Sequence, residues 1–124
     1  MRIFKTRQFD KWAVKEGLSD SVLRVAVAEM ETGLIDADLG GNVVKKRVAL
    51  PGRGKSGGAR TMLAYRLGER AFFVYGFAKN ERDNIDDKEL KTLKKLAAIQ
   101  LALAPVQLAL TLAEGKLIEV NQHG

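Results

Sequence analysis

The sequence predicts an α+β fold. We expect a small antiparallel β-sheet, with a short N-terminal strand and a three-stranded meander, packed against two N-terminal helices and followed by additional C-terminal helices. Three observations predict this fold. Apolar residues recur with helical spacing between residues 6 and 33. Residues 42–78 are rich in β-branched and aromatic residues punctuated by glycines. An acidic capping motif at 86–89 then opens a second helical region.

The N-terminal part of the chain predicts one strand and two helices. Residues 2–5 form a short strand, and residues 6–16 form a helix that a glycine ends. Ser19 is a good N-cap for a second helix, whose broad apolar face runs to a stop at Gly33. Residues 34–42 contain two consecutive glycines and are expected to form a loop.

The central part of the chain predicts the meander. Residues 42–50, 59–67 and 70–78 form its strands, and the third strand holds three of the five phenylalanines, which places it at the centre of the core. The glycine-rich stretch 51–58 is expected to be a long turn between the first two strands. Gly68-Glu69 supplies a tight hairpin between the second and the third.

The C-terminal part of the chain predicts two helices and a final short segment. Asp86 and Glu89 form a capping box that opens the first of these helices. The eighteen residues of Leu96–Ala113 carry no charge, but Pro105 interrupts them, so two short packed helices fit better than one membrane span. Residues 117–120 are expected to be a terminal strand or a tail.

Length and composition bound the classes of function. We expect one domain over residues 1–124, with a core over about 1–100 and a helical extension over about 104–124. The absence of cysteine excludes a disulfide framework, a thiolate metal site and cysteine catalysis. One histidine, His123, nearly excludes a zinc site and a Ser-His-Asp triad. With no signal peptide at its start, the chain is expected to be soluble and cytoplasmic and to need no metal or cofactor.

The positive charge of the chain is concentrated in one segment. Residues 41–82 hold ten cationic and two anionic residues, a net +8, whereas the whole chain carries +6 and the remainder therefore −2. Such clustering favours a localised polyanion site over a generally basic surface, although a solvated basic face is the simpler alternative.

The alternation of side chains along strands groups these cations. Lys45 and Arg47 share one face of their strand, and Lys46 lies on the other. Arg60 and Arg66 share a face of the next strand. The sequence leaves open which face of the sheet is the inner one, because both faces of the last strand are apolar.

Aromatic residues stand beside these cations in the sequence. Tyr75 and Phe77 on the third strand would suit the stacking of unpaired bases, and core packing is the alternative for both. The stretch Gly52-Arg-Gly-Lys-Ser56 is not a P-loop, because Ala49 occupies the position of the first glycine and a strand rather than a helix follows. It is either a plain hairpin connection or a phosphate contact through its amides, Arg53 and Lys55.

Three stretches of the sequence resemble a known family. Residues 45–60 (KKRVALPGRGKSGGAR), 75–82 (YGFAKNER) and 9–20 (FDKWAVKEGLSD) are similar to the RelE/HigB-type toxins of bacterial type II toxin–antitoxin systems. These toxins form part of the RelE/ParE superfamily. Within it, the glycine-rich hairpin resembles the HigB-like branch, and the resemblance covers about residues 1–100.

The resemblance implies an mRNA interferase that cleaves messenger RNA on the ribosome and thereby inhibits translation. The ribose 2′-hydroxyl attacks the adjacent phosphate, no metal takes part, and lysines and arginines stabilise the developing charge. The implied catalytic residues are Lys45, Arg47, Arg60 and Lys79. The implied residues for binding RNA or the ribosome are Lys46, Arg53, Lys55, Arg66, Tyr75, Phe77 and Arg82.

The chain departs from the RelE pattern at two places. Asn80 stands where RelE has an arginine, and Ile85-Asp86 stand where it has a catalytic tyrosine. The implied partners are the ribosome, mRNA and a cognate antitoxin of helix-turn-helix type, with no membrane involved. Two other functions remain open. One is a ParE-like toxin that inhibits a protein such as DNA gyrase, and the other is a non-catalytic module that binds RNA or the ribosome.

Overall fold

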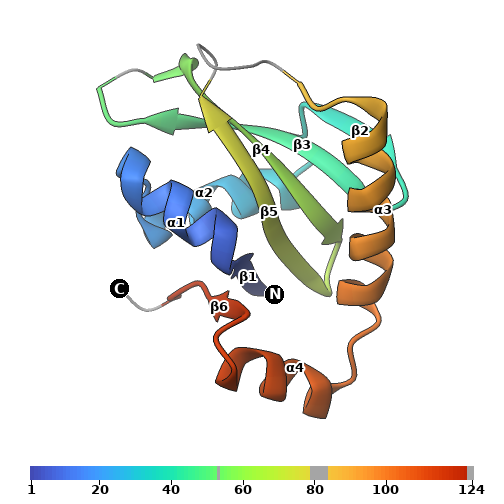
Figure 1. The fold of residues 1–124 in the computed structure, drawn as a ribbon. Coiled ribbons are helices and arrows are strands. Elements are labelled where there is room, and N and C mark those ends of the chain that lie inside the picture. Colours follow the sequence, from blue (N-terminus) through green and yellow to red (C-terminus); the bar gives the residue numbers. More distant parts are fainter. Residues whose placement is uncertain (53, 79–83, 123–124) are drawn as a thin grey trace.

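The computed structural model describes residues 1–52, 54–78 and 84–122, with the backbone alone for residues 54–57. Six strands and four helices follow one another along this part of the chain (Figure 1). Their order is β1 (Arg2–Thr6), α1 (Arg7–Glu16), α2 (Asp20–Glu31), β2 (Ala37–Gly40), β3 (Val43–Leu50), β4 (Gly54–Arg66), β5 (Arg70–Ala78), α3 (Asp87–Leu101), α4 (Pro105–Ala113) and β6 (Leu117–Glu119).

All six strands form one mixed sheet in the order β2-β3-β4-β5-β1-β6. Neighbouring strands are antiparallel except β1 and β5, which pair in parallel from Arg2–Arg70 to Lys5–Phe73. The predicted α+β class and the β3-β4-β5 meander are confirmed. Three details differ from the prediction: the expected loop over 34–42 contains β2, β4 begins at Gly54 inside the expected glycine-rich turn, and the sheet includes a parallel pair.

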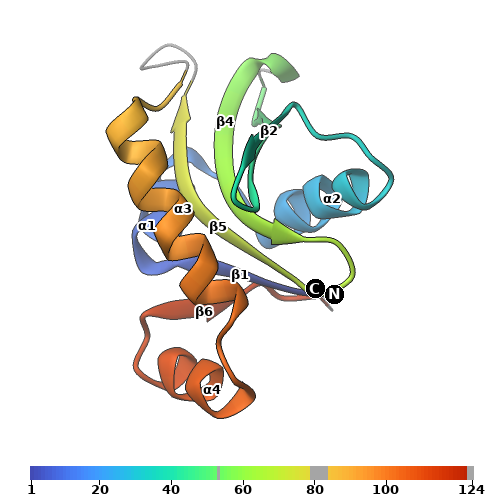
Figure 2. The same cartoon turned by 90° about the vertical axis from the view of Figure 1, so that its right-hand side faces the viewer.

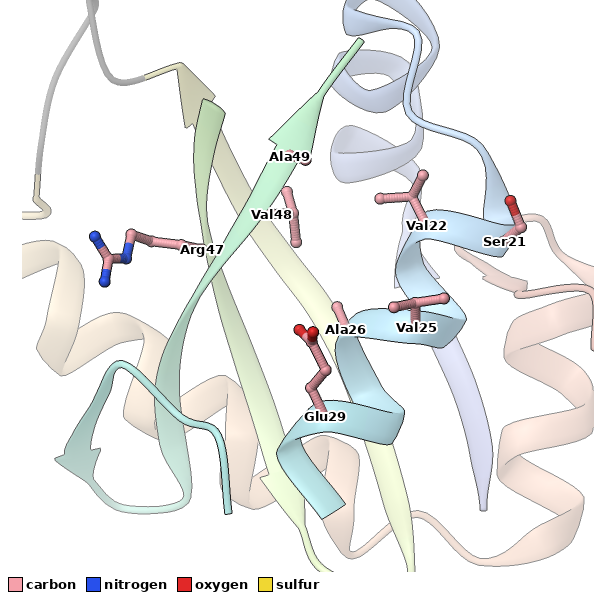
Figure 3. A pocket seen from close by; sticks show the side chains of 8 residues that line it. All are labelled: Ser21, Val22, Val25, Ala26, Glu29, Arg47, Val48 and Ala49. Atoms are coloured by element: carbon pink, nitrogen blue, oxygen red, sulfur yellow. The ribbon is translucent and has the colours of Figure 1, made fainter. Parts of the chain in front are cut away.

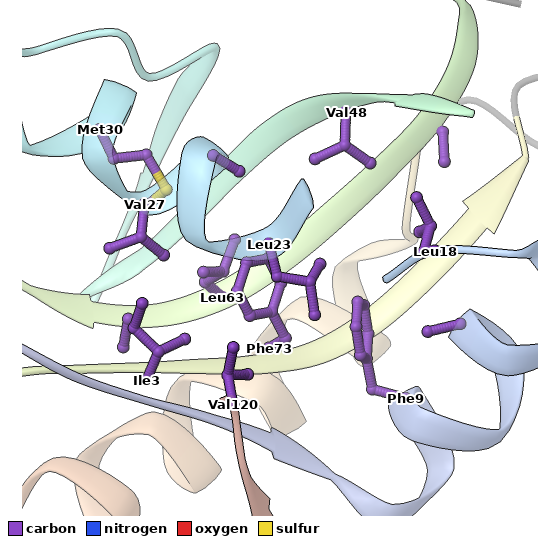
Figure 4. Packing of buried hydrophobic residues seen from close by; sticks show 14 of the residues in the cluster. Ile3, Phe9, Leu18, Leu23, Val27, Met30, Val48, Leu63, Phe73 and Val120 are labelled. Carbon is purple, nitrogen blue, oxygen red and sulfur yellow. The ribbon is translucent and has the colours of Figure 1, made fainter. Parts of the chain in front are cut away.

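Helices cover both faces of the sheet (Figure 2). On one face, α1 and α2 bury a cluster that includes Phe9, Leu23 and Phe73, with the rings of Phe9 and Phe73 5.1 Å apart (Figure 4). On the other face, α3 packs Leu93 and Ala97 onto a second cluster from the sheet. A sheet covered on both sides explains why both faces of β5 are apolar in the sequence.

Local signals in the sequence fix the ends of the helices. The Thr6 hydroxyl accepts a hydrogen bond from the Phe9 amide at the start of α1, and the Ser19 hydroxyl accepts one from the Val22 amide in α2. At the start of α3 the Asp86 carboxylate accepts from the Glu89 amide, and the Glu89 carboxylate accepts in return from the Asp86 amide. These caps agree with the predicted helix boundaries.

The C-terminal residues return to the sheet rather than forming a tail. After α4, strand β6 pairs with β1, and the Val120 amide donates to the Ile3 carbonyl at 2.8 Å. Among the described residues, no single helix is both long and apolar enough to cross a membrane. The uncharged run is divided between α3 and α4, whose axes are bent by 113°.

A buried lysine joins β1 to the first two helices. The Lys5 ammonium lies 2.8 Å from Asp10 of α1 and 2.8 Å from Asp20 of α2, and Lys5 is only 7% exposed. Asp20 also accepts a hydrogen bond from the Asn121 amide, so the same group holds the C-terminal segment. Partial burial would raise the pKa of Asp20, but the bonds from Lys5 and Asn121 outweigh it and hold that pKa below its ordinary value.

The Asp20→Asn variant is expected to lose about 1–2 kcal/mol of unfolding free energy at neutral pH, because the buried Lys5 ammonium keeps a single carboxylate partner. A carboxylate with a lowered pKa stabilises the fold above its ordinary pKa, and this contribution is lost as the pH falls through the lowered value. The difference between the variant and the wild type should therefore shrink in strong acid.

Urea denaturation at neutral and acidic pH measures this effect. Glu114→Gln is the matched control, because it also neutralises a carboxylate but belongs to an exposed pair with Lys116 and should change the stability little. An undiminished difference between Asp20→Asn and the wild type in strong acid would contradict the assignment.

Candidate active site

Two neighbouring rungs of the sheet bring the predicted basic residues together. In one rung Arg47 of β3, Arg60 of β4 and Phe77 of β5 are register partners. Two residues along the strands, in the next rung on the same face, Lys45 of β3 pairs with Met62 of β4, which pairs with Tyr75 of β5. The register therefore places cations and aromatic residues side by side on three strands, as the sequence pattern predicts.

This basic group lies on the face of the sheet that α3 partly covers. Met62 and Phe77 belong to the apolar cluster under α3, which identifies the face. Lys45, Arg47 and Arg60 line a cleft of about 200 Å³ together with Asp36 and Ala37. We refer to the cleft lined by these five residues as the basic cleft. Its three cations would attract an anion such as a phosphodiester.

The cations of the basic cleft differ in exposure. The Arg47 side chain is 48% exposed, whereas Arg60 is only 5% exposed and lies deeper in the sheet. Lys45, in the neighbouring rung of β3, is half-buried. An anion bound here would meet one fixed and partly desolvated guanidinium and two more accessible cations, and charge interactions strengthen as water is excluded.

Asp36 is the anion of the basic cleft. One of its carboxylate oxygens accepts from Arg47 Nε at 2.9 Å, and the other accepts from the Arg47 backbone amide at 2.6 Å. Its side chain is 23% exposed. Partial burial would raise the pKa of Asp36, but the two bonds from Arg47 and the nearby charge of Lys46 outweigh it, so the pKa lies below its ordinary value. Asp36 is therefore ionised at neutral pH.

The aromatic residues of the two rungs are not equally accessible. Phe77 is buried in the cluster under α3, so it packs in the core rather than offering its ring to a base. Tyr75 is half-buried at the edge of the same cluster. On the opposite face, Gly76 lies against Trp12 of α1, and a Cβ at that position would come within 2.2 Å of the indole ring. Trp12 therefore packs against β5 at Gly76, between Tyr75 and Phe77 in the chain and on the opposite face of the sheet.

Lys46 does not lie in the basic cleft, and this corrects its predicted role in binding RNA. Its ammonium is under α2, where it lies 3.0 Å from Glu29 and donates to the Leu34 carbonyl at 2.9 Å. The residue is 4% exposed. Its position follows from the strand alternation, because Val44 and Val48 on the same side of β3 belong to the core beneath α1 and α2.

An apolar cavity lies on this other side of β3. It has a volume of about 250 Å³ and is lined by α2 and by β3 around Val48 (Figure 3). Figure 3 shows Val48 directed toward α2 and the Arg47 side chain extending away from it. The close-up makes the change of face between consecutive residues of β3 visible.

Among the other predicted basic RNA-binding residues, the structure describes the side chain of Arg66 only, and it lies away from the basic cleft. Arg66 is at the opposite end of β4 and pairs with Glu69 at 3.5 Å. The side chain of Lys55 is outside the description, and so are the residues Arg53, Lys79 and Arg82. Sequence reasoning missed Asp36, which stands eleven positions before Arg47 in a segment expected to be a loop. No spacing rule connects the two, since their contact depends on how the segment after α2 returns to the sheet.

The fold and the basic cleft define an α+β protein with clustered cations on one face of its sheet. Comparison with protein families identifies it further. Residues 1–120 match the family described as the RelE toxin of the RelE/RelB toxin–antitoxin system. The chain belongs to this family and is therefore a toxin of a toxin–antitoxin system. No individually curated protein matches the chain.

Consecutive residues of β3 are expected to respond differently to substitution. Lys46→Met should lower the unfolding free energy by about 1–3 kcal/mol, because it leaves the Leu34 carbonyl and the Glu29 carboxylate without this donor. Arg47→Met should change it by no more than about 1 kcal/mol, because the Arg47 side chain is half exposed and Asp36 keeps its bond from the backbone amide at this position. Thermal and urea denaturation of both variants measure the difference. Equal losses would refute the assignment of Lys46 to the core and of Arg47 to the cleft.

Proposed function

We propose that the chain is a ribosome-dependent mRNA endonuclease whose active site is the basic cleft. The observation that carries the proposal is the convergence of Lys45, Arg47 and Arg60 around one cleft in a member of the RelE toxin family. A cleft of this kind suits a phosphodiester that gains negative charge as it reacts.

The proposed reaction is an internal transfer within RNA. The 2′-oxygen attacks the adjacent phosphorus, the bond from phosphorus to the 5′-oxygen breaks, and a 2′,3′-cyclic phosphate and a 5′-hydroxyl result. One proton leaves the 2′-hydroxyl and one is delivered to the 5′-oxygen. RNA supplies both the nucleophile and the leaving group, so the protein contributes orientation, proton transfer and charge stabilisation.

The three cations take different roles in this proposal. An arginine remains protonated in proteins and makes a poor base, so Lys45 in its neutral form is the candidate to accept the proton of the 2′-hydroxyl. Arg60 is held by burial between β3 and β5 and stabilises the charge on the reacting phosphate. Arg47 contacts the same phosphate from the more exposed side of the basic cleft. Tyr75, half-buried in the adjacent rung, is placed to stack on a base.

The partners follow from the same assignment. RelE family toxins pair with antitoxins, and we propose an antitoxin of helix-turn-helix type that keeps the basic cleft from RNA. The ribosome presents the mRNA, which places the reaction in the cytoplasm.

The Lys45→Ala and Arg60→Ala variants test the proposal. Each is expected to slow cleavage by about 10²-fold or more, because one removes proton transfer and the other removes charge stabilisation. Inducible expression with mapping of mRNA 5′ ends, with and without the antitoxin, measures cleavage in cells. Arg66→Ala is the matched control, since it removes a cation from the same strand but far from the basic cleft, and it should cleave like the wild type.

Two measurements keep this test decisive. Because Arg60 is buried, Arg60→Lys is made as well, which keeps the charge but loses the planar fork, and each variant is checked for folding by thermal denaturation. Growth arrest by the wild type with intact mRNA would overturn the proposal in favour of a protein target such as gyrase. Full cleavage by a folded Lys45→Ala or Arg60→Ala variant would overturn the assigned site.

A further inference from the structure

The segment that connects α2 to β2 is fixed to β3 at three consecutive residues. The Asp36 amide donates to the Lys45 carbonyl at 3.0 Å, and the Lys46 ammonium donates to the Leu34 carbonyl at 2.9 Å. The Arg47 amide donates to the Asp36 carboxylate at 2.6 Å. Two of these bonds involve the backbone of β3, and the third comes from the Lys46 side chain on the core side of the strand. The sheet therefore sets the position of Asp36.

From this position Asp36 holds Arg47 by one edge of its guanidinium. Its carboxylate accepts from Arg47 Nε and from the Arg47 backbone amide. Within the described part of the chain, Arg47 donates hydrogen bonds through Nε and its backbone amide, and the four N–H groups on its two η nitrogens engage no described acceptor. These groups form a planar fork, the geometry that binds a phosphate through two oxygens.

We propose that Asp36 is a positioning residue that orients the Arg47 guanidinium so that its η nitrogens bind an RNA phosphate in the basic cleft beside Lys45 and Arg60. The inference rests on the proposed function for the class of ligand. It explains why a carboxylate, Asp36, stands among the cations of the basic cleft.

A positioning role and a purely electrostatic role of Asp36 predict opposite effects. As a negative charge, Asp36 opposes the binding of a phosphate, so neutralising it would tighten RNA binding. As a positioning group, it fixes a long side chain that otherwise loses rotamer entropy on binding, so neutralising it would weaken RNA binding. The geometry favours the second role, because the carboxylate engages Nε and the backbone amide and leaves the η edge to a ligand.

The test is a double-mutant cycle of Asp36→Asn and Arg47→Ala. The probe is a 2′-O-methyl RNA oligomer, which cannot be cleaved, and its affinity is measured at low salt. Asp36→Asn is expected to weaken binding about five- to tenfold in the wild-type background, in line with the loss of one oriented charge-assisted contact. In the Arg47→Ala background it should have no effect. In the wild-type background, which cleaves RNA, Asp36→Asn should lower kcat more than it raises KM, because the oriented guanidinium matters most in the transition state.

Asp38→Asn is the matched control. It removes the same charge from β2, but the Asp38 carboxylate accepts from the Gly40 amide of its own strand and is not part of the basic cleft. It should leave affinity unchanged or raise it by less than about twofold, as expected for a screened exposed charge.

Each remaining outcome is decisive. Unchanged or tighter binding by Asp36→Asn would overturn the proposal. A loss of affinity that persists in the Arg47→Ala background, or a wild type that does not bind the oligomer, would overturn it as well. A wild type that binds the oligomer but cleaves no mRNA would refute the proposed function, while the binding cycle would still decide the role of Asp36.

Discussion

The alternation of side chains along β3 is the constraint on which the rest of the site depends. Three consecutive cations stand on this strand, and a period of two residues sends the middle one to the opposite face. Lys46 is consequently buried with Glu29 under α2, while Lys45 and Arg47 line the basic cleft. A shift of one residue in the strand register would bury the two cleft cations in the apolar core and expose the third. The core contacts of β3 thus fix the composition of the site.

The second face of the sheet is only partly covered, and this explains where the basic cleft lies. Helix α3 packs onto the cluster that contains Val43, Ala64 and Phe72, and its Lys94 side chain lies against Gly41 in the turn between β2 and β3. The rung of Arg47 and Arg60 runs from Phe77, which is buried in this cluster, to Arg47, whose side chain is 48% exposed on the outer part of the face. The fold therefore combines rigid support with an accessible surface, and a site on paired strands is held more accurately than one on a loop.

Much of this arrangement could be predicted from local patterns, and the remainder depends on contacts that are distant in the sequence. The capping residues and the β3-β4-β5 meander follow from the types of neighbouring residues. The grouping of Lys45 with Arg47 follows from the strand period. Three features need the assembled sheet: the parallel pairing of β1 with β5, the choice of the face that carries the basic cleft, and the contact of Asp36 with Arg47. Arg66 shares a face with Arg60 but is six residues along the strand, about 20 Å away, so a shared face does not make a shared site.

Asp36, the carboxylate of the basic cleft, reduces the repulsion among the three cations that line it. Cations within one cleft repel one another, and the burial of Arg60 adds a desolvation cost, so the site lowers the stability of the fold that carries it. Asp36 offsets part of this repulsion by pairing with Arg47, and its low pKa means that it does so throughout the neutral range. Asp36 contacts Arg47 through Nε and the backbone amide, so it does not occupy the η nitrogens that the proposed phosphate would use. One side chain can therefore offset the repulsion among the three cations and still leave the η nitrogens of Arg47 accessible to the proposed ligand.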